Sequence, residues 1–284
     1  MLREASKLFG KTPEVLLPRV PFRYQISYIC PLITKKSRIM RKEFMWLCLV
    51  IPALLFSMGC KKEDNDKNGD PTTPYTVSDI DGNTYKVVDI GGRAWMAEDL
   101  RTTCFRDGEP IPHVPLQSEW RNLTSVAYCW YDNDTLEPYS GFGLLYNGYA
   151  VQSGLLCPAG WHVPTDEEWQ ELEAYLGIDS ADLPRQGWRG SDQGGMLKEK
   201  GTAHWNAPNK EADNATGFTG LPGGYRNHIG LFHNLGVDGS WWSQTTSGTT
   251  DNIWYRRLAF DTGGIGRFNQ NPKSGFAVRC IRTE

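Results

Sequence analysis

Glycine-rich loops alternate with short aromatic segments through the second half of the sequence. From Gly187 onward three aromatic segments stand out, at 239–244, 252–260 and 275–282. The last two alternate in places between apolar and polar residues, as half-buried strands do. With 30 glycines, 17 prolines and 11 tryptophans, the chain suits a turn-rich domain of short strands better than a helix bundle. Hydrophobic residues make up 39% of the chain, enough for a packed core, and this argues against wholesale disorder.

The first half predicts one hairpin and one clear helix. Residues 75–80 and 84–90 are rich in strand-forming residues and flank the turn Asp-Gly-Asn at 81–83. A helix is predicted over 165–176. Thr165 is a good N-cap residue there, Glu168 completes a capping box, and Gly177 ends the helix.

The N-terminal part predicts export. Residues 1–59 hold 10 Lys and Arg but 3 acidic residues, and residues 45–58 are almost entirely apolar. That apolar run has the length of a signal peptide and is too short for a comfortable membrane span. Residues 55–60 resemble a bacterial lipoprotein signal with a relaxed lipobox, which implies lipidation of Cys60. We expect 40–59 to be the signal peptide and 1–39 a misassigned extension. The alternatives are a plain secretory signal, an uncleaved anchor, or a genuine cytoplasmic extension.

Residues 60–74 are polar and predict a flexible tether, so the folded domain should span 75–284. The formal charge of −3 excludes a strongly basic nucleic-acid-binding protein. No nucleophile-elbow, zinc-protease or phosphate-loop motif occurs, and no cysteine or histidine spacing favours a metal site, so no cofactor is predicted.

Four cysteines follow the predicted lipidation site, and in an exported protein they predict two disulfides. Their number alone leaves three pairings open. The residues are Cys104, Cys129, Cys157 and Cys280.

A pair of adjacent tryptophans offers a candidate binding site. On a strand, Trp241 and Trp242 would face opposite sides, one towards the core and the other nearer the surface. With Tyr225, Arg226 and Asn227, the surface tryptophan could stack on a sugar or a peptide. The interpretation that these aromatic residues form core is favoured over a binding platform.

Three sequence blocks carry a resemblance over nearly the whole predicted domain. The blocks are Asp-Ile-Asp-Gly-Asn at 79–83 with Trp-Met-Ala-Glu-Asp-Leu at 95–100, Cys-Pro-Ala-Gly-Trp-His-Val-Pro-Thr at 157–165 with Glu-Trp at 168–169, and Gly-Phe-Ala-Val-Arg-Cys-Ile-Arg at 275–282. Together they resemble the Fibrobacter succinogenes major paralogous domain of envelope lipoproteins in Bacteroidetes and Fibrobacteres, a family without a known activity.

The second and third blocks also resemble the formylglycine-generating, sulfatase-modifying fold, a relative of C-type lectins. This resemblance implies an α+β class: a glycine-rich, lectin-like fold with short antiparallel strands, few helices and long loops. It also favours a disulfide between Cys157 and Cys280, which leaves Cys104 with Cys129. The late cysteine pair of the formylglycine generators is missing, because Cys280 is the last cysteine and no other follows Cys157. The sugar-binding motifs of calcium-dependent lectins are missing too.

Two tripeptides, at 134–136 and 179–181, resemble Bacteroidetes O-glycosylation sites, which makes Thr135 and Ser180 candidate glycan carriers. The sequence as a whole predicts an outer-membrane lipoprotein without catalytic activity, held in the membrane by its lipid and exposed at the cell surface. Its domain would bind a glycan or protein ligand in adhesion or ligand capture, and no nucleic acid. The alternatives are an enzyme of the formylglycine-generating type, a structural envelope component, and a domain that faces the periplasm.

Overall fold

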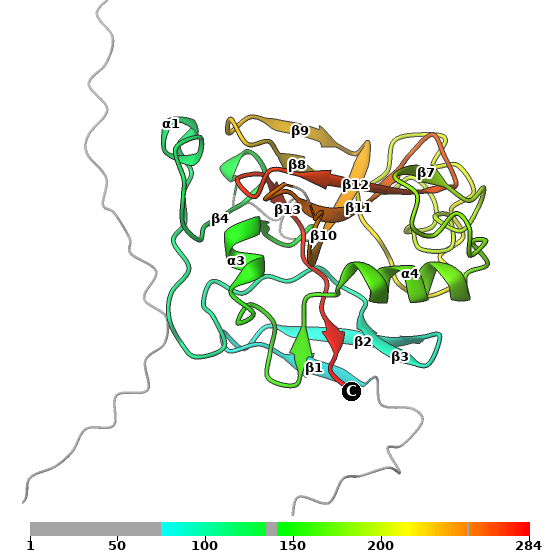
Figure 1. Ribbon diagram of the computed structural model, residues 1–284, viewed down its shortest axis with the longest axis horizontal. Helices are drawn as coiled ribbons and strands as arrows, with labels where there is room; N and C mark the ends of the chain where they lie inside the picture. Colours follow the sequence, from blue (N-terminus) through cyan, green and yellow to red (C-terminus); the bar gives the residue numbers. More distant parts are fainter. Residues whose placement is uncertain (1–74, 135–140, 249) are drawn as a thin grey trace, which may run out of the picture.

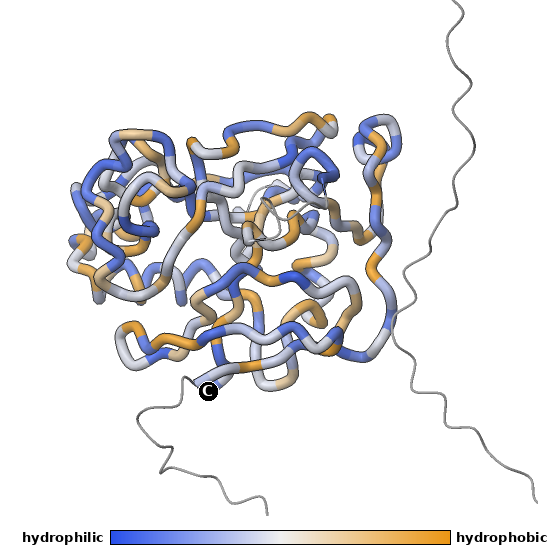
Figure 2. The backbone as a smooth tube through the Cα atoms, turned by 180° about the vertical axis from the view of Figure 1, so that it is seen from behind, coloured by the Kyte–Doolittle hydropathy of each residue, from blue (hydrophilic) through white to orange (hydrophobic). Residues whose placement is uncertain are grey.

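The computed structural model describes residues 75–134, 141–248 and 250–284 (Figure 1). The predicted signal peptide, Cys60, the tether and Thr135 lie outside these ranges. Along the described chain, hydrophobic and hydrophilic residues alternate every few positions (Figure 2). No helix in these ranges is long and apolar enough to cross a membrane.

The smaller of two β-sheets has five strands in the order β1-β2-β3-β14-β6. Its first two strands form the predicted hairpin, with antiparallel pairing from Thr76 opposite Lys86 to Ser78 opposite Thr84. The Asp79 carboxylate closes the turn by accepting a hydrogen bond from the backbone N–H of Asn83 at 2.9 Å. The strands are β1 Thr76–Ser78, β2 Thr84–Ile90, β3 Arg93–Met96, β6 Trp161–His162 and β14 Ile281–Arg282.

The larger sheet has nine strands, eight of them in the order β4-β5-β13-β8-β10-β11-β12-β7, with β9 paired to β8. The predicted strands at 239–244 and 252–260 are its long central strands. The third predicted strand is divided, because its start joins this sheet and its end joins the smaller one. The strands are β4 Tyr128–Cys129, β5 Leu145–Asn147, β7 Gly187–Arg189, β8 Gly223–Arg226, β9 Phe232–Leu235, β10 Asp238–Thr246, β11 Ile253–Ala259, β12 Ile265–Gln270 and β13 Gly275–Phe276.

The expected α+β class is wrong, because the described residues form a β-rich fold. They contain three short α-helices, α1 Gln117–Trp120, α3 Gly148–Gln152 and α4 Asp166–Tyr175, and the 3-10 turn η1 Tyr131–Asn133. The α+β class was implied by the resemblance to the formylglycine-generating fold, whereas two sheets make up most of the described fold. The strands are mostly short and separated by glycine turns, so their local signals are weak.

Helix α4 matches the predicted helix and lies between the two sheets (Figure 1). Thr165 caps its first turn, and the reciprocal capping box with Glu168 is present. Its apolar side packs into a core of large aromatic rings. Trp169 of the helix lies 5.0 Å from Trp95 of β3, between ring centroids, and Phe218 lies 5.8 Å from Trp241 of β10. The helix therefore joins the sheets through one hydrophobic cluster.

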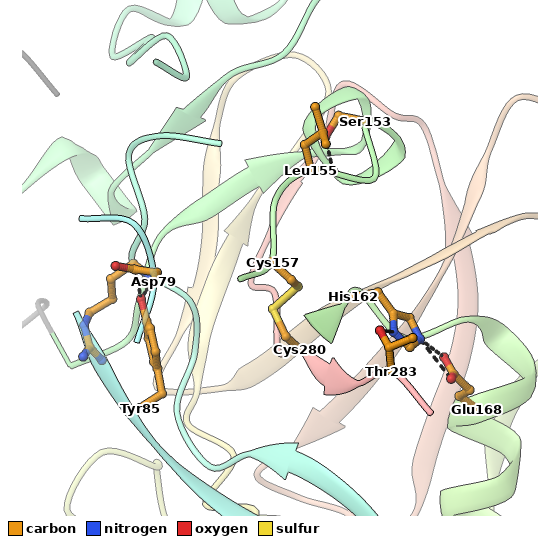
Figure 3. The surroundings of a disulfide bond; sticks show 10 residues. Asp79, Tyr85, Ser153, Leu155, Cys157, His162, Glu168, Cys280 and Thr283 are labelled. Atoms are coloured by element: carbon orange, nitrogen blue, oxygen red, sulfur yellow. Dashed lines mark hydrogen bonds and ion pairs between the residues drawn. A yellow bond between two sulfur atoms is a disulfide. The ribbon is translucent and has the colours of Figure 1, made fainter. Parts of the chain in front are cut away.

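A second cluster surrounds the disulfide between Cys157 and Cys280, which confirms the predicted pair (Figure 3). The predicted partnership of Cys104 and Cys129 is wrong, because Cys129 is a buried free thiol. Cys129 lies on β4 in a third, smaller cluster. Cys104 lies in another part of the chain, where its backbone forms an isolated antiparallel β-bridge with Pro110. Burial raises the pKa of the Cys129 thiol to about 12, so it stays protonated at neutral pH.

Candidate functional site

The tryptophan pair does not form a surface site. Trp241 and Trp242 point to opposite sides of β10, as alternation predicts, but they are 1% and 0% exposed. The indole of Trp241 donates to Asp99 at 2.8 Å, and that of Trp242 donates to the Tyr146 carbonyl at 2.8 Å. The prediction of one tryptophan nearer the surface is wrong, because both sides of the sheet are covered at this point.

The other predicted platform residues also have structural partners. Arg226 is buried, and its guanidinium donates to the carbonyls of Val114 and Pro115 at 2.7 and 2.9 Å. Tyr225 and Asn227 are half-buried on either side of it. Ser180 is exposed in the loop after α4, where its proposed glycosylation stays a prediction.

The three sequence blocks of the resemblance meet in the scaffold. Arg279 of the third block donates its Nε to Asp99 of the first block at 2.8 Å, and both side chains are buried. Near the disulfide, His162 of the second block lies 2.8 Å from Glu168 through Nε2 and 3.0 Å from the Thr283 hydroxyl through Nδ1 (Figure 3). These block residues hold the sheets and α4 together, so a binding surface has to be sought elsewhere.

One face of the larger sheet is covered by α4 through buried ion pairs. Glu173 of the helix is fully buried and forms a bidentate pair with Arg189 of β7, both contacts at 2.7 Å. Arg256 of β11 reaches Glu173 at 2.5 Å and Asp166 at 2.7 Å. Arg267 of β12 contacts Asp166 at 2.7 Å. We call this side, with its two acids and three arginines, the covered face.

The opposite face at the β7 edge is open. Strand register places Trp188 opposite Gly266, Gly266 opposite Arg257, and Arg257 opposite Ser240. Directly opposed residues share one face of a sheet, and Arg189 and Arg256, each one position away, point to the covered face. Trp188 is 43% exposed, which makes it the most exposed tryptophan among the described residues.

A pocket of about 440 Å³ opens beside this tryptophan. Its size falls in the range of ~300–1,000 Å³ that is usual for small-molecule sites. It is bounded by the start of β10, the end of β11, the following turn and β7. We call it the Trp188 pocket, and its main lining residues are Trp188, Asp238, Arg257, Phe260, Asp261 and Thr262.

Asp238 is the unusual group in this pocket. Its side chain is 0% exposed, and its Oδ2 accepts hydrogen bonds from Asn234 and, at 2.6 Å, from Arg257. Its Oδ1 is buried and has no hydrogen-bond partner among the described residues. The Nε–H of Arg257 also lacks a partner there. Buried polar atoms are nearly always hydrogen-bonded, and two unmet ones belong to residues that line this pocket, which makes it the candidate ligand site.

Gly266, which lies between Trp188 and Arg257 in the strand register, shapes the pocket. A Cβ atom on Gly266 would lie 2.6 Å from Cε2 of Phe268, so only glycine lets that ring lie over the strand. The Phe268 ring meets the edge of Trp188 at 5.9 Å between centroids, and the Arg257 guanidinium lies 5.7 Å from the Trp188 ring. Phe268 and Arg257 therefore both contact the exposed indole and hold it in place.

A buried lysine fixes the pocket's other wall. Lys198 is 0% exposed, and its ammonium donates to the carbonyls of Lys210 at 2.7 Å, Ala259 at 3.0 Å and Thr262 at 3.0 Å. Burial lowers the pKa of Lys198 to about 8, against the opposing charges of Asp261 and Glu211. The amine therefore keeps its proton at neutral pH and ties the turn after β11 to the preceding loop. Nothing in the local sequence of Lys198 indicates this role.

A second hollow, of about 320 Å³, lies between α4 and β3. Its polar groups are paired with one another. Arg93 lies 2.6 Å from Glu168, 3.1 Å from Glu171 and 3.2 Å from Glu284. Burial alone raises the pKa of the Glu168 carboxyl, but hydrogen bonds from His162 and the Thr165 amide, with help from Arg93, lower it to about 2. This hollow is best explained as part of the scaffold, and the Trp188 pocket remains the candidate site.

Sequence reasoning did not find the Trp188 pocket. Its acid and its arginine are 19 residues apart, and Trp188 lies 50 residues before Asp238, so only the strand register brings the three together. The one available signal was an isolated tryptophan between two glycine-containing turns.

Comparison with known proteins gave one match. The family model described as the Fibrobacter succinogenes major domain matches residues 88–282, more than half of the chain. No significant match was found among curated proteins or among solved structures. The expected family is therefore confirmed, whereas the expected likeness to lectins stays a prediction.

Proposed function

Because this chain belongs to the Fibrobacter succinogenes major domain family, we propose that it is a lipid-anchored protein of the cell surface that binds a ligand in the Trp188 pocket. The family match is consistent with a surface or envelope protein. The lipid anchor at Cys60 and the tether that follows it rest on the sequence pattern described above.

The pocket carries the argument for binding. An exposed indole, an unmet carboxylate oxygen and an unmet guanidinium N–H belong to residues that line one hollow. Exposed aromatic residues with a few placed polar groups are the usual composition of a binding site. The acids of the covered face and of the hollow between α4 and β3 already have partners inside the protein, whereas the Trp188 pocket combines an unmet carboxylate oxygen with an exposed aromatic ring.

Anchoring and exposure can be tested on the bacterium that carries the protein. We expect protease treatment of intact cells to remove the domain, and Cys60→Ala to release the protein from the membrane fraction. Cleavage only after the outer membrane is permeabilised would contradict surface exposure. Continued membrane association of the Cys60→Ala protein would contradict the anchor.

Binding can be tested on the same cells with two matched variants. Trp188→Ala removes the exposed pocket aromatic, and Tyr175→Ala removes an aromatic that is 65% exposed on α4, away from the pocket. At equal surface amounts, Trp188→Ala should weaken attachment of the cells to a surface coated with their own extracellular matrix, and Tyr175→Ala should not. Equal attachment by all three strains would contradict adhesion through this pocket.

A further inference from the structure

We propose that the Trp188 pocket takes a neutral sugar residue, a pyranose with adjacent free hydroxyl groups, as part of a polysaccharide or glycan. This inference rests on the proposed function, because it names the ligand class of the same pocket.

The exposed ring selects for a ligand with one apolar face. Trp188 is 43% exposed, and Phe268 meets its edge, so the ring is held while part of its surface is free. A flat aromatic surface can cover the C–H face of a pyranose ring and remove that apolar area from water. A small polar ion would gain nothing from this surface.

The charges around the pocket cancel, which favours a neutral ligand. Asp238 is paired with Arg257 at 2.6 Å, and Asp261 acts electrostatically on the buried Lys198 behind the wall. An anionic ligand would meet both carboxylates. A cationic ligand would meet the Arg257 guanidinium, which already lies near the Trp188 ring at 5.7 Å. Burying an unpaired charge in either case costs free energy.

The unmet polar atoms match a pair of neighbouring hydroxyl groups. Asp238 Oδ1 can accept one hydrogen bond, and Arg257 Nε–H can donate one. These atoms belong to two side chains that are joined by an ion pair between Arg257 Nη2 and Asp238 Oδ2. One hydroxyl of a vicinal pair can donate to the carboxylate while its neighbour accepts from the guanidinium. Both atoms are buried below the pocket surface, so sugar binding requires the partly exposed Arg257 side chain to turn.

The inference can be tested by native affinity electrophoresis of the full-length protein. The protein is solubilised in a detergent without a sugar headgroup, because alkyl glycosides would occupy the pocket. The gels contain neutral polymers (glucan, mannan, galactan and xylan) or acidic ones (polygalacturonate and hyaluronan). We expect at least one neutral polymer to slow the wild-type protein, and neither acidic polymer to do so.

Four variants give the test its controls. Trp188→Ala should weaken binding of the polymer that retards the wild-type protein at least about tenfold, because it removes the aromatic surface that covers the sugar. Trp188→Tyr keeps an aromatic ring and should retain most of the binding. Asp238→Asn should weaken it, and Tyr175→Ala should leave it unchanged. Circular dichroism spectra confirm that each variant is folded before it is compared.

Three results would overturn the sugar assignment. The first is that none of the four neutral polymers slows the protein. The second is that only acidic polymers slow it, and the third is that Trp188→Ala leaves the retardation unchanged. The cell-attachment experiment separates this from the wider proposal. If Trp188→Ala lowers attachment while no neutral polymer binds, the pocket has a ligand of another class. If Trp188→Ala also leaves attachment unchanged, the proposed adhesive function fails as well.

Discussion

Both faces of the larger sheet carry buried acids that pair with arginines, but the pairs on the two faces differ in how completely they are hydrogen-bonded. On the covered face, both oxygens of Asp166 and both oxygens of Glu173 accept hydrogen bonds. On the open face, Asp238 has one oxygen bonded and the other unmet. An unpaired guanidinium N–H occurs on both faces, at Arg189 and at Arg257, so it does not distinguish them. The unmet carboxylate oxygen and the exposed tryptophan do.

We infer from this difference that one face of the sheet stabilises the fold and the other binds the ligand. Helix α4 covers one face and closes its charges into a network, which stabilises the joint between the two sheets. The other face has no such cover at the β7 edge, where Trp188 is exposed. Substitutions on the covered face should therefore act on stability, and substitutions on the open face on binding.

The largest effect should come from Glu173→Gln on the covered face. This change leaves Arg189 and Arg256 without the carboxylate that both contact. Removing one partner of a buried ion pair costs about 3–5 kcal/mol. Urea unfolding of the variant should show a loss of this size in the free energy of unfolding. A loss below about 1 kcal/mol would mean that the network does not hold α4 to the sheet.

Glu168→Gln should show a pH-dependent loss on the other side of α4. The pKa of Glu168 is about 2, against an ordinary value of 4.5, so its charge stabilises the fold above pH 4.5 and this contribution is lost as the pH falls towards 2. The wild-type protein should be more stable than the variant by roughly 3 kcal/mol at pH 6, and the difference should vanish near pH 2. Gln keeps the capping acceptor, so a difference constant with pH would contradict the role of the charge.

Asp238→Asn should cost less stability than either change on α4. The amide keeps one acceptor oxygen for Asn234 or Arg257, and the side chain of Arg257 is already 31% exposed to water. We expect a loss of about 1 kcal/mol in the free energy of unfolding, together with weaker sugar binding. A loss as large as that of Glu173→Gln would show that Asp238 belongs to the scaffold.

Trp188→Ala should have the smallest effect on stability. Its side chain is exposed at a sheet edge, so the free energy of unfolding measured by thermal denaturation should change by no more than about 1 kcal/mol. Sugar binding should fall in the same variant. Gly266→Ala provides the converse case, because its Cβ would displace Phe268 while the Trp188 side chain itself is kept. Unchanged binding in Gly266→Ala would show that Phe268 does not support the indole.

The sequence predicted those parts of the fold that depend on neighbouring residues. The hairpin at 75–90 follows from its turn residues, and α4 from Thr165 and Glu168, three positions apart. The disulfide between Cys157 and Cys280 was implied by the family resemblance. Short strands were expected, but the α+β class was implied by the resemblance to the formylglycine-generating fold, and the described residues form a β-rich fold instead.

The site could not be predicted because it depends on which face of the sheet is covered. Alternation correctly placed Trp241 and Trp242 on opposite sides, but it could not show that core covers both. Glu173 meets Arg256 across 83 positions of sequence, a distance over which no local pattern operates. The same limit hid Asp238, whose partner Arg257 becomes its neighbour only through the register of β10 and β11.

In the proposed function, ligand binding is confined to Trp188, while the buried tryptophans belong to the scaffold. Indole N–H signals of ¹⁵N-tryptophan-labelled protein report this directly, with Trp188→Tyr assigning the Trp188 signal. On titration with oligosaccharides of the four neutral polymers, we predict that the Trp188 signal shifts and that those of Trp241 and Trp242 stay fixed. No shift at Trp188 with any oligosaccharide, or a larger shift at Trp241 or Trp242, would contradict the account.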